Sequence, residues 1–119
     1  MNNKILGNKG EQEAAIYLEN HGYEIRERNF RSKTGEIDII VSRGKTIIFV
    51  EVKTRGSYAY GIPSEAVTIA KQRKIIRTAQ AYIQSKRLYG YAYRFDVLEV
   101  LAPKSGNISF RLLENAFEA

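Results

Sequence analysis

Acidic side chains interrupt two apolar segments of the chain that a short polar segment separates. The apolar segments are Ile37–Val41 and Thr46–Val52, and both are rich in β-branched residues. The polar segment Ser42–Lys45 contains a glycine, so the whole stretch predicts a β-hairpin. Asp38 lies within the first apolar segment, and Glu51 lies near the end of the second. A carboxylate in a buried strand requires a partner, which makes both residues candidates for chemistry.

The register of the hairpin decides whether the two carboxylates meet. Side chains of a strand alternate between faces, which places Glu51 and Lys53 on the same face. If Val41 pairs with Thr46, Asp38 lies diagonal to Glu51, about 7–8 Å away along the backbone. A three-residue loop with a bulge would turn Asp38 to the other face. The predicted site therefore requires a loop with an even number of residues.

Two carboxylates at this separation favour a site for a hard divalent cation. Crowded, partly buried carboxylates repel each other unless a cation neutralises them, and Mg²⁺ and Mn²⁺ prefer oxygen ligands. Such an ion activates water and stabilises charge on a phosphoryl oxygen, while a neighbouring lysine orients the attacking water. A cross-strand salt-bridge ladder is the more common explanation of any single charge at a strand end. The whole set of charges against two apolar strands favours a functional site.

The same residues resemble a known nuclease signature. Asp38, followed across a hairpin by Glu51-Val52-Lys53, resembles the PD-(D/E)xK signature of the restriction-endonuclease-like nucleases. The wider pattern resembles the bacterial YraN-like family of predicted endonucleases, which is similar to archaeal Holliday-junction resolvases. It comprises Gly10-Glu11, Gly35-Glu36-Ile37-Asp38, Phe49 to Arg55, Tyr60-Gly61 and Pro63, and covers nearly the whole chain. The sequence departs from the superfamily at Ile37, where a proline usually precedes the aspartate.

The resemblance implies a restriction-endonuclease-like core and a Mg²⁺- or Mn²⁺-dependent endonuclease that hydrolyses phosphodiester bonds in DNA. Asp38 and Glu51 would bind the metal, with the carbonyl of Val52 as a further ligand, and Lys53 would position or activate water. Glu11 would support the metal or hold a second ion, and Glu36 is a weaker candidate. Branched or structured DNA is the implied substrate class. Resolution of a four-way junction requires two active sites, so a symmetric homodimer is expected with that substrate.

The first predicted helix, Asn3–His21, leaves two roles open for Glu11. Glu11 precedes an apolar stripe and falls on the inward face of the helix. Gly7 and Gly10 each weaken a helix by about 1 kcal/mol, which suggests close backbone approach to a neighbour. Alternatively, the helix begins near Asn8, with Asn8 as the N-cap and Glu11 as the acid of a capping box.

Basic side chains near the predicted site are candidates for contacts to a nucleic-acid backbone. These residues are Arg28, Arg31, Lys33, Arg55, Lys71, Arg73, Lys74 and Arg77. A solvated edge strand explains the first three equally well, and a solvated helix face is the usual reading of Lys71, Arg73, Lys74 and Arg77.

Two further polar residues have alternative interpretations. Gln72 lies within the predicted buried stripe Ile69, Ile76, Ala79 and Ile83 of the second helix, so it needs a hydrogen-bond partner. That partner is a water of the metal site or DNA in one interpretation, and a loop carbonyl in the other. Tyr58, in a segment rich in Gly, Ser and Tyr, could stack on an unpaired base or pack on the sheet.

The chain reads as one α/β (α+β) domain over residues 1–119. The predicted elements are helices over Asn3–His21 and Pro63–Lys86, strands over Tyr23–Arg31, Ile37–Val41, Thr46–Val52, Tyr93–Leu101 and Ile108–Leu113, and a helical turn within Glu114–Ala119. Because a helix separates strands that must return to one sheet, we expect a mixed central sheet of about five strands flanked by two main helices.

Composition narrows the functional class. Cysteine is absent and His21 is the only histidine, which excludes disulfides and thiolate metal sites and argues against a zinc site. The chain lacks a long apolar run and a secretory leader, so we expect a cytoplasmic protein without a membrane span. A net charge of +6 suits a nucleic-acid partner.

Two other functions are compatible with this sequence. One is a nuclease-fold protein of low activity that serves as a nucleic-acid-binding or DNA-repair accessory module. The other is a basic interaction domain whose acidic residues form a salt-bridge network.

Overall fold

Five strands form one sheet whose spatial order follows the sequence, β1-β2-β3-β4-β5. The computed structural model describes residues 3–56 and 67–119, with side chains from Lys9 onward. The elements are α1 (Asn3–Asn20), β1 (Glu24–Ser32), β2 (Gly35–Arg43), β3 (Thr46–Arg55), α2 (Ile69–Lys86), β4 (Ala92–Leu101) and β5 (Ser109–Phe117). Strands β3 and β4 are parallel, and all other neighbours are antiparallel. The predicted α+β class, with a mixed five-stranded sheet and two flanking helices, is confirmed.

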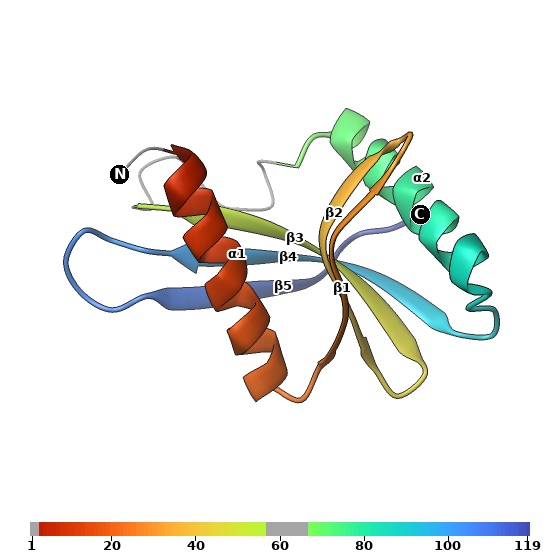
Figure 1. Cartoon of the computed structure of the whole chain (residues 1–119), viewed down its shortest axis with the longest axis horizontal. Coiled ribbons are helices and arrows are strands. Elements are labelled where there is room, and N and C mark those ends of the chain that lie inside the picture. Colours follow the sequence, from red (N-terminus) through yellow and green to blue (C-terminus); the bar gives the residue numbers. More distant parts are fainter. Residues whose placement is uncertain (1–2, 57–66) are drawn as a thin grey trace.

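The two helices cover opposite faces of the sheet (Figure 1). Helix α1 packs its residues Ala14 and Leu18 against a cluster that includes Val50 of β3. Helix α2 packs Tyr82 against the other cluster, which includes Phe49. Strand β3 is therefore buried on both faces, as its continuous apolar run predicts. The polar strand β1 lies at the edge of the sheet, also as predicted.

The turn between β2 and β3 is shorter than predicted. Arg43 pairs with Thr46, so the loop contains only Gly44 and Lys45, with Gly44 at φ +58°. The predicted pairing of Val41 with Thr46 is wrong, because the strands continue into the polar segment and a positive φ at glycine closes a two-residue loop. The loop still has an even number of residues, so Asp38 stays on the face that the predicted site requires.

Helix α2 begins later than predicted. Thr68 is its N-cap, with an extended backbone and a side chain that accepts a hydrogen bond from Lys71 N at 3.2 Å. Pro63, the predicted first residue, lies outside the described residues. The predicted buried stripe is also wrong at Ile69, which is 66% exposed, whereas Ile75 and Tyr82 are buried. Ala79 is buried as predicted, and Ile76 and Ile83 pack against the same cluster, so the buried face of α2 includes most of the predicted stripe and extends beyond it.

The C-terminal segment is a strand rather than the predicted helical turn. Strand β5 continues to Phe117, which pairs with Phe95 of β4 and stacks on its ring with centroids 5.1 Å apart. Pairing with β4 and burial of the Phe117 ring stabilise the extended conformation over a short, isolated helical turn.

Close packing of α1 on β3 explains one of the two helix glycines. Helix α1 begins at Asn3, so Asn8 lies inside it and the interpretation of Asn8 as the N-cap is wrong. A Cβ atom on Gly10 would lie 1.8 Å from Oγ1 of Thr54, a distance that no side chain tolerates. The glycine therefore lets the backbone of α1 approach β3, and it places the next residue, Glu11, beside the sheet.

We predict that Gly10→Ala destabilises the protein, although alanine is a better helix former by about 1 kcal/mol. Overpacking against Thr54 should lower the free energy of unfolding by about 1–3 kcal/mol, measured by urea denaturation. The exposed Gln12→Ala on the same helix is the control and should change stability by less than about 0.5 kcal/mol. Equal stability of Gly10→Ala and wild type would contradict the packing described.

Candidate active site

The site begins where strand β2 separates from strand β3. Their pairing stops at Ile39 and Val50, immediately before Asp38 and Glu51. The Oδ2 atom of Asp38 accepts a hydrogen bond from the backbone N–H of Val52 at 2.8 Å. Where the pairing of β2 and β3 stops, the carboxylate of Asp38 therefore replaces a backbone carbonyl as the acceptor for Val52 N–H. This hydrogen bond holds the Asp38 side chain beside β3.

Glu51 approaches Asp38 from the neighbouring strand and also meets a lysine of α2. Its side chain is buried on the α2 face of the sheet, and its Oε1 atom lies 3.1 Å from Nζ of Lys71. Lys53 follows two residues later on the same face, and its ammonium group lies next to that of Lys71. Asp38, Glu51 and Lys53 therefore come together as the sequence predicts.

Helix α1 contributes a third carboxylate. Glu11 is in hydrogen-bonding contact with Asp38, and Glu36 of β2 is also close. With its amide oriented so that the nitrogen donates, Asn29 lies 3.2 Å from Oε2 of Glu11 and 3.3 Å from Oε1 of Glu36. Asn29 adopts φ +53°, a conformation that asparagine tolerates better than most residues, and it connects acids from two different elements.

Asp38, Glu36, Glu51 and Lys71 line a cleft of about 220 Å³ between β2, β3 and the first turns of α2. The lining residues are Gly35, Glu36, Asp38, Glu51, Lys71, Lys74 and Ile75. The β1–β2 hairpin reaches over to α2 (Figure 1), and Gly35 and Glu36 at its end line the cleft. Its tip is anchored because the hydroxyls of Thr34 and Thr78 lie 2.9 Å apart and Thr78 donates to the carbonyl of Lys74 at 2.8 Å.

Burial and repulsion between neighbouring carboxylates raise the pKa values of Asp38 and Glu11. Burial raises the pKa of Asp38 to about 8, and the charge of Glu51 adds to this rise, whereas the hydrogen bond from Val52 opposes it. Burial also raises the pKa of Glu11, and Glu36 adds to the effect, while the hydrogen bond with Asp38 and the charge of Arg28 lower it. The acids of the cleft are therefore held close together at a cost that a cation would relieve.

The pKa values of Lys53 and Lys71 shift in opposite directions. Burial lowers the pKa of Lys53, and the adjacent charge of Lys71 lowers it further, although Glu51 acts in the other direction. Burial also acts to lower the pKa of Lys71, but its contact with Glu51 outweighs this effect, and the net result is a raised pKa. Lys71 is thus the direct counter-ion of Glu51, and Lys53 is the more easily deprotonated ammonium group.

The acids already have internal partners. Among residues 9–56 and 67–119, no three acidic, histidine or cysteine side chains stand around one point in a geometry that could hold a metal ion. Asp38 is turned toward the N–H of Val52, and Glu51 toward Lys71. The carbonyl of Val52 remains a predicted ligand. A metal ion would therefore have to draw the carboxylates away from these partners.

The predicted nucleic-acid-binding residues differ in their exposure: six are exposed, Lys71 faces the sheet, and Arg55 is largely buried. Exposed side chains are those of Arg28, Arg31, Lys33, Arg73, Lys74 and Arg77, of which Arg31 pairs with Glu36 at 3.4 Å. Lys71 does not lie on the solvated helix face that the sequence predicted. It shares the stripe of Ile75 and Tyr82, which faces the sheet, because these positions are four and eleven residues apart along the helix.

Arg55 belongs to a buried ion pair. Its side chain is 17% exposed, and Nε lies 3.4 Å from Oε2 of Glu99 on β4, which is fully buried. Within the described part of the chain, neither oxygen of Glu99 has a hydrogen-bond partner. Arg55 is therefore directed at a buried carboxylate. The sequence reasoning missed Glu99, although its position in the apolar run Phe95–Leu101 is the same kind of signal that identified Glu51.

Gln72 and Tyr58 do not add to the described site. The side-chain amide of Gln72 donates to the carbonyl of Val67 at 3.0 Å, which is the loop contact that was its alternative interpretation. Tyr58 lies outside the described residues. Sequence reasoning also missed Asn29, whose only signal is an asparagine inside a strand, where this residue is disfavoured.

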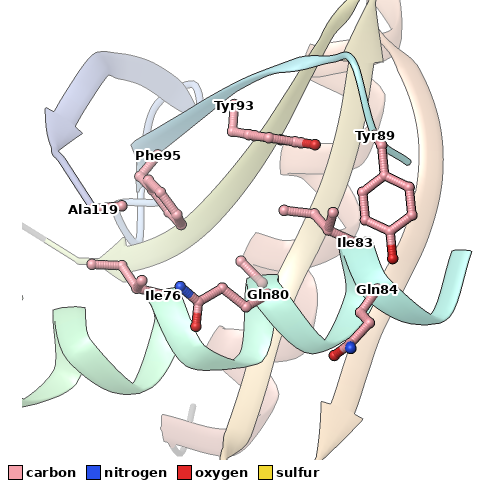
Figure 2. A pocket seen from close by; sticks show the side chains of 9 residues that line it. Ile76, Gln80, Ile83, Gln84, Tyr89, Tyr93, Phe95 and Ala119 are labelled. Atoms are coloured by element: carbon pink, nitrogen blue, oxygen red, sulfur yellow. The ribbon is translucent and has the colours of Figure 1, made fainter. Parts of the chain in front are cut away.

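A second, larger hollow is chemically different. It has a volume of about 390 Å³ and lies between the second half of α2, β4 and the C-terminus. Figure 2 shows Tyr89, Tyr93, Phe95 and Ile83 around it, and its lining is mainly apolar. It does not share the acids and lysines of the cleft.

Neither described helix has an apolar stretch that would let it cross a membrane.

Comparison with known proteins relates nearly the whole chain to one family. Residues 10–100 match the family described as "Uncharacterised protein family UPF0102". A UPF0102 protein of Caldicellulosiruptor saccharolyticus is 49% identical over 118 residues, which cover 98% of this chain and 100% of the relative. A UPF0102 protein of Clostridium botulinum strain Loch Maree is 52% identical over 118 residues, which cover 98% of this chain and 96% of the relative.

The raised pKa of Asp38 predicts a pH-dependent stability in the absence of divalent metal. An aspartate of the unfolded chain titrates near pH 4, whereas Asp38 in the folded protein titrates at about 8. Between these values the folded state binds the proton more tightly, so stability should fall as pH rises, by at most about 1.4 kcal/mol per pH unit from this group.

Asp38→Asn should remove this part of the slope, since the amide oxygen can still accept the hydrogen bond from Val52. The measurement is urea denaturation of both proteins in EDTA at several pH values between 5 and 8. The variant should gain stability over wild type as pH rises. Parallel pH profiles would show that Asp38 is not held in the destabilised charged state.

Proposed function

The chain belongs to the UPF0102 family, the YraN-like family that its motifs resemble, and from the geometry of its carboxylate cleft we propose that it is a metal-dependent DNA endonuclease. The proposed reaction is hydrolysis of a phosphodiester bond with Mg²⁺ or Mn²⁺, in a restriction-endonuclease-like core and in the cytoplasm. The observation that carries the proposal is the convergence of Asp38, Glu51 and Glu11 from three elements beside Lys53.

The residues of the cleft fit a hard divalent cation. Asp38 and Glu51 offer only oxygen donors. Burial, together with the adjacent charge of Glu51, raises the pKa of Asp38, so a bound cation would stabilise its charged form. Asp38 and Glu51 would hold the ion, with the Val52 carbonyl as a further ligand and Glu11 as a supporting acid or ligand to a second ion. When bound, the cation neutralises the acids and stabilises negative charge on a phosphoryl oxygen.

Lys53 is the group that would act on the attacking water. It lies on the same face as Glu51, close to both acids, and its ammonium group can hold a water molecule by a hydrogen bond. The lowered pKa of Lys53 eases proton exchange with that water. The positive charge that remains when Lys53 is protonated stabilises the charge that develops in the transition state.

Exposed basic side chains would hold the DNA backbone. Lys74 lines the cleft itself, and Arg28, Lys33, Arg73 and Arg77 lie exposed on β1, the β1–β2 turn and α2. Such contacts make binding salt-dependent and largely independent of base sequence. Branched or structured DNA is the proposed substrate class, and a four-way junction would require a homodimer to supply two active sites.

We predict metal-dependent cleavage of labelled linear, flapped and four-way-junction DNA. Asp38→Asn and Lys53→Met should each reduce the cleavage rate by at least about 100-fold, because one removes a metal ligand and the other the group that orients water. The exposed Glu19→Gln and Lys104→Met repeat the same chemical changes away from the cleft and should cleave like wild type. Rates are read on denaturing gels with Mg²⁺ or Mn²⁺.

Two results would contradict the proposal. Cleavage that persists in both cleft variants would indicate a contaminating nuclease. Salt-sensitive DNA binding without metal-dependent cleavage of any substrate would favour a DNA-binding accessory module instead.

A further inference from the structure

The contact between Lys71 and Glu51 places an internal cation at the position where the proposed metal would bind. Nζ of Lys71 lies 3.1 Å from Oε1 of Glu51, and the Glu51 side chain is buried. Asp38 lies beside Glu51 in the same cleft. A divalent ion bound by these two acids would lie within a few ångströms of the Lys71 ammonium group, and like charges at such a distance repel strongly in a buried site.

The position of Lys71 lets its ammonium group move while its backbone stays fixed. Its backbone N–H donates to the side chain of Thr68 at 3.2 Å, in the first turn of α2. The next residue, Gln72, is tied to Thr68 and to Val67 by hydrogen bonds of 2.8 and 3.0 Å. The Lys71 side chain is nevertheless 43% exposed, and the cleft that it lines is open. A long lysine side chain can therefore turn from Glu51 toward a ligand in the cleft.

We propose that Lys71 occupies Glu51 as an exchangeable counter-ion in the metal-free protein, and that it turns to a DNA phosphate when a divalent cation takes its place. This inference rests on the proposed function, because it assigns a second role to a residue of the same cleft. Metal binding and DNA binding are then coupled: the cation releases a phosphate-binding group that is otherwise engaged. The cleft therefore reaches its full affinity for DNA only when its carboxylates bind the metal.

Metal binding without DNA tests the first half of the proposal. Mn²⁺ affinity is measured by calorimetry for wild type, Lys71→Met, Lys71→Arg and Lys74→Met. Lys71→Met introduces an uncharged side chain of similar length and so removes the charge that competes with the metal. This variant should therefore bind Mn²⁺ about tenfold more tightly than wild type. Lys71→Arg keeps the charge, and Lys74→Met removes a charge from the same cleft that is not in contact with Glu51, so both should stay within about threefold of wild type.

DNA binding with and without metal tests the second half. The affinity for a short fluorescent duplex is measured in EDTA and in Ca²⁺, with a gel to confirm that the duplex stays intact. Lys71→Met should match wild type in EDTA but bind about fivefold more weakly in Ca²⁺. For Lys74→Met, the affinity for DNA should fall by the same factor in EDTA as in Ca²⁺. Thermal unfolding checks that all variants are folded.

The outcomes separate this inference from the proposed function. Equal Mn²⁺ affinity of Lys71→Met and wild type, or an equal loss of DNA affinity in EDTA and in Ca²⁺, would overturn the role of Lys71 and leave the metal site intact. Mn²⁺ binding that does not depend on Asp38, tested with Asp38→Asn, would instead overturn the proposed metal site and the inference with it.

Discussion

Repulsion among carboxylates at the opening between β2 and β3 is the constraint on which the rest of the site depends. Asp38 and Glu51 face each other where the strand pairing stops, and Glu11 reaches them from α1. The fold holds these acids in place by means that have nothing to do with their charge. Strand β3 is buried on both faces, Gly10 permits close packing of α1, and the β1–β2 hairpin is anchored on α2. The backbones that carry Asp38 and Glu51 cannot separate without disturbing the core.

The metal-free protein meets this repulsion with internal partners. The N–H of Val52 holds Asp38, the ammonium group of Lys71 holds Glu51, and the amide of Asn29 bridges Glu11 to Glu36. Burial of Asp38, reinforced by the charge of Glu51, favours its protonated form and raises its pKa to about 8. Each of these contacts joins an acid to a neutral or singly charged group, whereas the proposed divalent cation would be shared by two carboxylates.

Local patterns predicted the elements and the central group of residues, and long-range contacts decided the remainder. The apolar runs interrupted by Asp38 and Glu51 were sufficient to predict a central hairpin in which these two acids lie together, because a charge in a buried strand requires a partner. The loop length was not predictable, since Ser42 and Arg43 suit a turn as well as a strand. The direction of Lys71 depends on which face of α2 packs on the sheet, and this face is occupied by the buried residues Ile75, Thr78, Ala79 and Tyr82.

The most direct test of the central claim is the position of a bound Mn²⁺ ion. Crystals grown with Mn²⁺ would be examined by anomalous diffraction at the manganese edge. The account predicts one strong peak between the carboxylates of Asp38 and Glu51, about 2 Å from their oxygens, with Lys71 turned away from Glu51. A structure in which Mn²⁺ binds elsewhere, or in which the cleft stays without a peak and Lys71 remains on Glu51, would contradict it.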